Sequence, residues 1–545
     1  MHQKQGIRGY KVLYEESLDT SIEDILLTRF KDDELSKTLE DLHDPYLLMW
    51  MKEAVERIKK AHERKERVII FWDYDVDGVT STAILMHFFK KIWMQVSYRL
   101  PHRIKDGYGL KNYFIDDVVS QWVSLLITVD CGTKDVEVIR YAKNLGLDII
   151  VTDHHAVPEV IPVEAVAVIN PKRKDCTYPF KSLSWAWVAF KLMMALARDF
   201  FPQEVYKNYL KESIDIAAIG TVADCMSLTW ENRIIVQEWL KQIKNSRSKW
   251  IRRLIEHKLE EDLDADVFWF LIWPRLNAAW RMDTPVKALH LILDQKETLD
   301  QTLLDIEVLN DKRKQLTSLF FEEAMMAVNP QDNILFFSSD TIEHWIIWIV
   351  AWRLTEHFYR PSIVLTEHND ILVASCRSPD FFDIVSLLEK YKDLFVTFWW
   401  HKQAAGFSIK KEEFQKLKAL LVDELNALDF SSHKKMIYVD KILQSEEIWF
   451  KLIQKINQFR PFWIGNPKPI FMLQNFRHSG VSYLWKWVEH IKFNHPFWFK
   501  ILWFWFGEYM DKIKKSEDIS LIFDISEDNY SWKKWLMLKI IDIVL

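Results

Sequence analysis

Short apolar runs rich in β-branched residues alternate with amphipathic segments between Arg67 and Thr229, and this alternation restricts the folds open to the chain. The apolar runs are 68–71, 125–129, 147–152 and 165–169, and helical spacing occurs in 81–91 and 136–145. Continuous apolar strands separated by helices are typical of a parallel, doubly wound α/β sheet. In such sheets the functional side chains gather beyond the carboxyl ends of the strands.

Carboxylates and imidazoles follow three of these predicted strands. They are Asp73, Asp75 and Asp77 after the first, Asp130 after the second, and Asp153, His154 and His155 after the third. In an extended segment the first three carboxylates would point the same way, and Gly78 would permit the turn into the next helix. A solvated helix-capping cluster would explain one of these aspartates, but not three.

Like charges this close together repel one another unless cations neutralise them. Carboxylate oxygens and imidazole nitrogens suit Mn²⁺ or Mg²⁺, so we predict two divalent ions at this edge of the sheet. Asp224 ends a later helical run and supplies a further acid, although such an aspartate on its own is more often only a helix terminus.

The rest of the chain predicts further domains, because 545 residues exceed what a single core organises. We expect a helical lead-in over 1–60, a catalytic α/β domain over 61–230 and a helical region with a long connecting helix over 231–330. A second α/β domain would occupy 331–430, and short β-like runs over 431–545 suit an oligonucleotide-binding (OB) barrel. The net charge of −6 neither indicates nor excludes nucleic-acid binding.

Several features point to a cytoplasmic protein without a membrane partner. No apolar run reaches the roughly 18 residues of a membrane span. The first residues do not resemble a signal peptide, and the four cysteines lack CxxC spacing, as expected in a reducing compartment.

Tryptophan is unusually abundant and glycine unusually scarce, with 26 and 12 residues. A typical glycine content of about 7% would give about 38 residues, which equals the two counts together. An aromatic core or a base-stacking surface would be one explanation. The alternative hypothesis is that UGA codons read as glycine in the cell have been translated here as tryptophan.

The order of these motifs resembles that of the DHH phosphoesterase superfamily, and most of all its RecJ family of single-strand-specific exonucleases. The similarity extends over about residues 45–545 and includes 399–407, which is similar to the GGHxxAAG motif of the DHHA1 domain. Many superfamily members have histidine where Phe71 stands. Tryptophan occupies glycine positions or glycine-bearing motifs of the family at residues 72, 185, 187, 273, 280, 399, 400 and 463.

The resemblance implies a role for each matching residue. Metal ligands would be Asp73, Asp75, Asp77, Asp130, His154 and Asp224, with His155 at the scissile phosphate and Asp153 orienting the imidazoles. Arg103, Ser375 and Arg377 match a pocket for a 5′-terminal phosphate. His401 would approach the nucleotide backbone, and Arg275, Asn277 and Arg281 would line the DNA channel.

The implied activity is 5′→3′ hydrolysis of single-stranded DNA in repair and recombination by a monomer. A single-strand-binding protein and a RecQ-type helicase are the expected partners. Two alternatives stay open: a phosphodiesterase for short oligonucleotides or cyclic dinucleotides, and an inactive scaffold that binds single strands. The retained metal aspartates favour an enzyme, and the predicted connecting helix and barrel favour the exonuclease.

Overall fold

The computed structural model describes residues 1–16, 20–31, 34–72, 76–100, 109–258, 263–282, 284–293, 298–401, 404–430, 433–484, 490–504, 506–516, 518–528 and 535–545. The chain divides into two compact units, each built from separate stretches of sequence. One comprises residues 21–309 and 454–468 and is called the catalytic unit below. The other comprises residues 1–20, 310–453 and 469–545 and is called the second unit.

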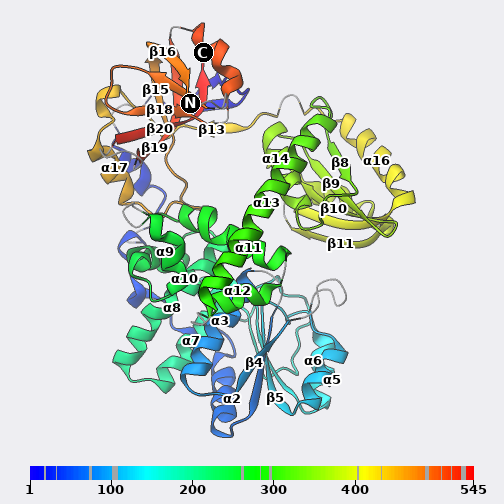
Figure 1. Cartoon of the computed structure of the whole chain (residues 1–545). Coiled ribbons are helices and arrows are strands. Elements are labelled where there is room, and N and C mark those ends of the chain that lie inside the picture. The colour runs from blue at the N-terminus through cyan, green and yellow to red at the C-terminus, as the bar shows by residue number, and fades with distance from the viewer. Residues whose placement is uncertain are drawn as a thin grey trace. The chain divides into compact units, whose positions relative to one another are not determined.

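A parallel sheet of five strands forms the centre of the catalytic unit, as the sequence predicted (Figure 1). Its order is β4-β3-β5-β6-β7. The strands are β3 (Arg67–Trp72), β4 (Val96–Arg99), β5 (Val123–Val129), β6 (Asp148–Thr152) and β7 (Ala167–Ile169). From β4 the chain returns past β3 to form β5, so the strand order reverses direction between β3 and β5. Ligand sites of open α/β sheets lie at such a reversal.

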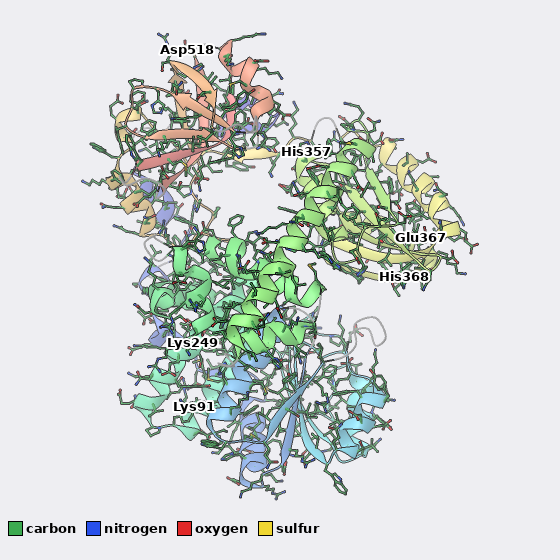
Figure 2. The ribbon with its side chains drawn as sticks, viewed as in Figure 1. Lys91, Lys249, His357, Glu367, His368 and Asp518 are labelled. Atoms are coloured by element: carbon green, nitrogen blue, oxygen red, sulfur yellow. The ribbon has the colours of Figure 1, made fainter. Side chains whose placement is uncertain are left out.

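Helices cover both faces of this sheet (Figure 1). On one face α5 (Asn112–Ser120) and α6 (Val136–Asn144) bury a cluster that contains Ile69 and Phe71. On the other face the helices are α2 (Met51–Glu63), α3 (Val76–Lys91), α7 (Trp185–Phe200) and α8 (Gln203–Ala223). Figure 2 labels Lys91, the last residue of α3. Alternate strand residues therefore enter separate cores.

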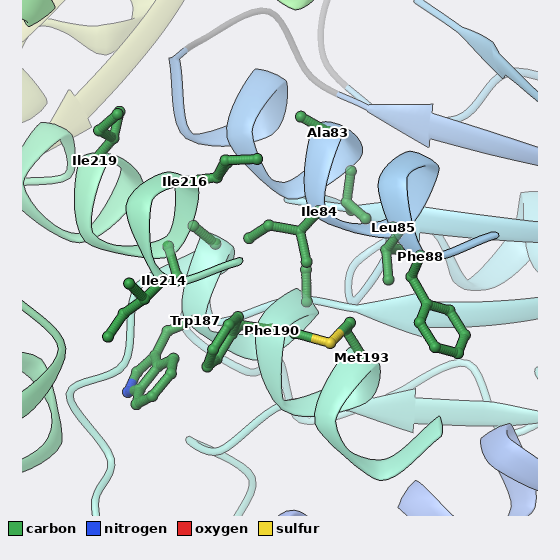
Figure 3. Close-up of a cluster of buried hydrophobic side chains, with 14 of the residues drawn as sticks. Ala83, Ile84, Leu85, Phe88, Trp187, Phe190, Met193, Ile214, Ile216 and Ile219 are labelled. Carbon is green, nitrogen blue, oxygen red and sulfur yellow. The ribbon is translucent and has the colours of Figure 1, made fainter. Parts of the chain in front are cut away.

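The larger core lies where α3, α7 and α8 pack together (Figure 3). Ile84 and Phe88 of α3 meet Phe190 and Met193 of α7, and all four side chains are buried. Lys191 lies within the same helix, where its ammonium group is 2.7 Å from the Glu231 carboxylate. Both charged side chains are fully buried, so each depends on the other for charge compensation.

The catalytic unit contains further helices before and after those that cover the sheet. They are α1 (Ile22–Leu27), α9 (Trp230–Gln242), α10 (Lys249–Ile255), a π-helical turn (Phe268–Ile272), α11 (Trp273–Met282), α12 (Pro285–Ile292) and the start of α13 (Leu299–Ala327). The long helix α13, expected over 303–327, continues into the second unit.

A distant segment, 454–468, completes the catalytic unit. The buried guanidinium group of Arg233 donates hydrogen bonds to the carbonyl oxygens of Phe459 (3.0 Å), Arg460 (2.7 Å) and Pro461 (3.4 Å). The amide of Phe462 donates to the Asp264 carboxylate at 3.0 Å. These bonds satisfy buried backbone groups of the segment and fix it to the helices.

The second unit contains a mixed sheet of five strands, ordered β11-β12-β10-β9-β8. The strands are β8 (Leu335–Ser339), β9 (Ser362–His368), β10 (Ile371–Arg377), β11 (Phe395–His401) and β12 (Ala404–Lys410). Its helices are α14 (Ile347–Phe358), α15 (Ile384–Glu389) and α16 (Lys411–Asn426). Figure 2 labels Glu367 and His368 at the end of β9, where Glu367 pairs with Lys411 at 2.8 Å.

A second sheet, ordered β14-β15-β19-β20-β18-β17-β16, belongs to the C-terminal part. Its strands are β14 (Lys441–Ile442), β15 (Phe471–Phe476), β16 (Gly480–Tyr483), β17 (Ile491–Asn494), β18 (Lys500–Trp503), β19 (Ile519–Asp528) and β20 (Trp535–Val544). Helix α18 (Met510–Lys514) accompanies it, whereas α17 (Phe450–Asn457) begins in the second unit and ends in segment 454–468 of the catalytic unit. The β-rich character predicted for this region is confirmed. Among the described residues, no helix is both long and apolar enough to cross a membrane.

The predicted helical character of the first 60 residues is wrong for its beginning. Strands β1 (His2–Gln5) and β2 (Lys11–Tyr14) form an antiparallel hairpin. Strand β2 also pairs in parallel with β13 (Met436–Tyr438). This partner lies more than 400 residues away along the chain, so local periodicity could not reveal it.

Candidate metal centre

The candidate site lies where the neighbouring strands β3, β5 and β6 end. Asp130 follows β5 and Asp153 follows β6, whereas Asp73 and Asp75, after β3, lie outside the described residues. The backbone of Asp130 is left-handed, with φ 67°, a conformation that aspartate tolerates better than most residues. Its amide donates to the Thr152 carbonyl at 3.1 Å, which ties the ends of β5 and β6 together.

Asp77 occupies the first turn of α3, so the extended geometry expected for this part of the motif is wrong. Its carboxylate accepts hydrogen bonds from the amides of Trp185 (3.0 Å) and Ala186 (3.3 Å), at the start of α7. A carboxylate at a helix N-terminus satisfies free amides there and is favoured by the helix dipole. A Cβ at Gly220 of α8 would stand 2.4 Å from Asp77 Oδ1, so this packing needs glycine at 220.

Asp153 organises both histidines. Its Oδ1 accepts hydrogen bonds from the amides of His154 (2.7 Å) and His155 (3.0 Å) and from Nδ1 of His155 (2.9 Å). Its Oδ2 accepts from the Thr133 amide at 3.1 Å. Burial alone would raise the pKa of the Asp153 carboxyl, but the hydrogen bonds and attraction from His155 outweigh burial and hold that pKa far below its usual range. Asp153 is therefore an ionised, fully engaged carboxylate.

His154 has the form that a metal ligand needs. Its Nδ1 lies 2.5 Å from the Leu183 carbonyl oxygen, which can only accept, so Nδ1 carries the proton and Nε2 has a free lone pair. Burial, together with the charge of Lys172, lowers the pKa of His154 to about 3 and keeps the ring neutral. Its Nε2 lies 3.9 Å from Oδ2 of Asp224, the residue that caps α8.

Asp130 and His155 form a second close pair, with 4.0 Å between Asp130 Oδ1 and His155 Nδ1. Asn170, which the sequence analysis missed, supports this side of the site. Its amide group donates to the His155 carbonyl (3.1 Å) and to the Thr133 hydroxyl (3.3 Å). The available signal was its position: Asn170 directly follows the apolar strand β7.

The donor set suits hard or borderline divalent ions, since carboxylates from separate elements converge with a neutral imidazole. Among the residues that the structure describes, no three such side chains are placed closely enough to hold an ion together. Asp73 and Asp75, which would add two carboxylates beside β3, fall outside that set. Phe71 packs against Phe114 (4.6 Å between ring centroids) in the core, so its side chain is not part of the donor set.

Two of the predicted phosphate-binding residues lie on one strand of the second unit. Ser375 and Arg377 belong to β10, where they face Gly406 and Ala404 of β12 across the ladder. The Arg377 guanidinium donates to the Ser375 hydroxyl at 3.2 Å, and its burial lowers the pKa of Arg377. The backbone of His401, at the end of β11, pairs with that of Ala404 in β12. Strand β12 pairs with β10, so the described part of the segment similar to the GGHxxAAG motif lies beside the strand of Ser375 and Arg377.

Other predicted substrate contacts are placed less informatively. Arg275 donates to the Glu307 carboxylate (2.5 Å) and to the Leu271 carbonyl (2.8 Å), and Asn277 is buried. Arg275 is therefore partly exposed and held by two contacts, whereas Asn277 lies in the interior of the catalytic unit. Arg103 and the side chains of Arg281 and His401 lie outside what the structure describes.

Two family models match the chain. The N-terminal domain of the DHH family matches residues 67–221, and the RecJ OB domain matches residues 439–542. The first range contains β3 to β7 together with Asp130, Asp153 and both histidines.

Relatives match over most of the chain. It is 32% identical to the single-stranded-DNA-specific exonuclease RecJ of Bacillus subtilis over 92% of this chain and 64% of that protein. It is 31% identical to RecJ of Salmonella typhimurium over 80% of each chain. The chain therefore spans just under two thirds of the length of its Bacillus subtilis relative.

Solved structures agree. The crystal structure of RecJ from Thermus thermophilus in complex with Mn²⁺ superposes with a TM-score of 0.81, at 24% identity, over 96% of this chain and 75% of that one. An exonuclease RecJ bound to manganese superposes with a TM-score of 0.60, at 28% identity, over 70% of this chain and 95% of that one. The chain belongs to the RecJ family of the DHH phosphoesterases.

Proposed function

We propose that this protein is a metal-dependent exonuclease that hydrolyses the phosphodiester bonds of single-stranded DNA from the 5′ end. The observation that carries this proposal is the pair of hydrogen bonds from the His155 ring and backbone to Asp153, next to a neutral His154 that faces Asp224. The RecJ relatives are named single-stranded-DNA-specific exonucleases, and membership of their family supports this class of substrate.

We propose that Asp77, Asp130, His154 and Asp224 hold two divalent ions, Mn²⁺ or Mg²⁺, with Asp73 and Asp75. The manganese-bound RecJ relative supports this assignment. When bound, two such metal ions lower the pKa of a water molecule and neutralise charge on the phosphate. The low pKa of His154 supports its role, because metal ions do not have to displace a proton from Nε2.

The protein's own residues would orient the reaction. Asp153 fixes the plane of the His155 ring through Nδ1, and His155 would contact the scissile phosphate. Asp77 anchors the start of α7, and the Leu183 carbonyl fixes the tautomer of His154. These contacts hold the side chains before the substrate arrives, which is how an active site avoids reorganisation during the reaction.

Substrate recognition would use both units. Arg103, Ser375 and Arg377 are proposed to bind the 5′-terminal phosphate, since guanidinium groups form bidentate hydrogen bonds with its oxygens. His401 would contact the nucleotide backbone, and Arg275, Asn277 and Arg281 would line the DNA channel. The C-terminal OB domain would add stacking and backbone contacts that tolerate any sequence.

The cellular role proposed is DNA repair and recombination in the cytoplasm. The protein would act as a monomer on strands exposed by a RecQ-type helicase and covered by a single-strand-binding protein. Size-exclusion chromatography with light scattering, on the protein alone and with each partner, tests the monomeric state and the two partner assignments. A stable dimer of the protein alone would contradict the monomer.

Long single strands labelled at the 5′ or the 3′ end test the reaction. We expect labelled mononucleotide from the 5′-labelled strand first, only with Mn²⁺ or Mg²⁺. Asp224→Asn should abolish release, whereas Asp117→Asn, at an exposed position on α5, should not affect it. Early release of the 3′ label would refute the direction. Cleavage of only very short oligomers would indicate the phosphodiesterase, and binding without turnover the scaffold.

A further inference from the structure

We infer that Trp185, Trp93 and Trp122 mark positions at which the protein made by its own cells carries glycine, so that the working metal centre has no indole over its histidines. This inference extends to other tryptophans at glycine-like positions. It does not depend on the proposed exonuclease activity, because it concerns the identity of the residues.

The ends of three helices provide the clearest comparison. Gly146 stands two residues after the end of α6 and has φ 81°, and the amides of Gly146 and Leu147 donate to the carbonyls of Lys143 and Ala142, both at 3.1 Å. This pattern is a Schellman motif, in which glycine normally supplies the left-handed residue. A Cβ at Gly146 would meet no atom within 4 Å, so the backbone angle, not space, favours glycine here.

Helix α3 ends in the same motif, but with tryptophan at that position. Trp93 has φ 58°, and the amides of Trp93 and Met94 donate to the carbonyls of Lys90 (3.1 Å) and Phe89 (2.9 Å). Trp122 follows α5 with φ 61° and donates to the Val119 carbonyl at 3.0 Å. These side chains are 92% and 84% exposed, so no packing compensates for the left-handed backbone.

Tryptophan with a left-handed backbone also occurs at the starts of two described helices. Trp50 at the start of α2 has φ 65°, and Trp230 at the start of α9 has φ 46°. Four of the eleven described residues other than glycine with positive φ are therefore tryptophan. A bulky side chain is a genuine outlier in this region, whereas glycine adopts it freely.

Buried tryptophans supply independent evidence. The indole N–H groups of seven buried or half-buried tryptophans have no acceptor among the described residues: 72, 185, 187, 239, 250, 463 and 503. A buried indole N–H usually finds a partner, because leaving it without one is costly. The set includes Trp72, which directly precedes the first aspartate of the site.

Trp185 connects this pattern to the metal centre. Its indole packs on His154 and His155, with ring centroids 4.1 and 4.9 Å apart. Its useful contribution comes from the backbone, since the Trp185 amide donates to Asp77. Glycine would retain that hydrogen bond and remove the indole from both imidazoles, which gives the His154–Asp224 pair room for a hydrated ion. The neighbouring Trp187 is buried in the core shown in Figure 3.

The translation of UGA as glycine explains these observations together. A single codon then accounts for the scarcity of glycine, the excess of tryptophan and the left-handed tryptophans. The coding DNA provides a direct test: we expect TGA at codons 93, 122 and 185, and TGG at these codons would overturn the inference.

Mass spectrometry of the protein from its own cells tests the residue itself. Tryptic cleavage gives peptides 92–99 and 182–191, which contain positions 93 and 185. We expect glycine at both positions. Tryptophan in either peptide would overturn the assignment for that position, whether or not the protein is an exonuclease.

Calorimetric titration with Mn²⁺ tests the effect on the metal centre. We expect Trp185→Gly to bind Mn²⁺ severalfold more tightly than the protein with tryptophan at position 185. Trp93→Gly, which repairs a helix end away from the site, should raise thermal stability and leave Mn²⁺ affinity unchanged. If circular dichroism shows both proteins folded and Trp185→Gly binds Mn²⁺ no more tightly than the protein with tryptophan at 185, the effect assigned to the indole is refuted.

Discussion

Replacing Asp153 by asparagine should reveal how strongly one buried carboxylate organises the candidate site. The carboxylate accepts four hydrogen bonds, three through Oδ1 and one through Oδ2. Asparagine has a single acceptor oxygen. If that oxygen replaces Oδ1, the NH₂ group faces the Thr133 amide, and two buried donors oppose each other.

The expected loss follows from these contacts. One hydrogen bond to an ionised group disappears and a buried amide loses its acceptor, which together cost about 2 to 4 kcal/mol. The three remaining bonds to Oδ1 also lose their charge assistance. Because Asp153 orients His155 and the backbone of His154, we further expect Mn²⁺ affinity to fall about 10- to 100-fold.

Urea unfolding followed by circular dichroism and Mn²⁺ titration measure the two effects. Asp148→Asn is the matched control, since Asp148 begins the strand that Asp153 follows but forms a partly exposed ion pair with Arg57. That control should change stability by about 1 kcal/mol or less and leave Mn²⁺ binding intact. If Asp153→Asn behaved like the control in both measurements, the proposed organising role of Asp153 would be wrong.

Three further predictions concern stability. Lys191→Met should cost about 3 to 5 kcal/mol in urea unfolding, because Glu231 stays buried without its cation. Adding Glu231→Leu should recover only part of that loss, because the His43 amide and the Tyr178 hydroxyl then lose their acceptor. Burial raises the pKa of Asp215 to about 6, so the folded protein retains a proton that the unfolded chain releases. Stability should therefore fall as pH rises from about 4 to 6, and Asp215→Asn should remove this part of the slope in thermal unfolding. Trp93→Gly should add about 1 kcal/mol and Gly146→Trp should remove a similar amount, and equal melting temperatures would contradict the helix-end argument.

Sequence patterns were sufficient to predict the sheet and the edge at which its functional groups meet. Continuous apolar runs define parallel strands, and Asp130 and Asp153 directly follow two that prove to be neighbours. The strand order itself was not predictable, because it depends on the path of the chain between strands. The residue roles implied by family resemblance remain predictions.

The missed details depend on contacts between distant residues. Alternating aspartates fit an extended segment as well as a helix start. Asp77 in fact lies within α3, and its carboxylate accepts hydrogen bonds from the first amides of α7, more than 100 residues later in the chain. The Leu183 carbonyl that fixes the His154 tautomer carries no side-chain signal at all. Asn170 was recognisable only as a polar residue after a short strand.

The attachment of segment 454–468 to Arg233 has a consequence for biosynthesis. About 140 residues of the second unit are made between Leu309 and Gln454. At synthesis rates of about 5 to 20 residues per second, this interval lasts roughly 7 to 30 s. During that time the nascent catalytic unit exposes the carbonyl-binding guanidinium of Arg233 and the Asp264 carboxylate without their backbone partners. Fragments cut after Leu309 should therefore expose an adhesive, incomplete surface, and a faithful minimal catalytic fragment must carry 454–468 on a linker.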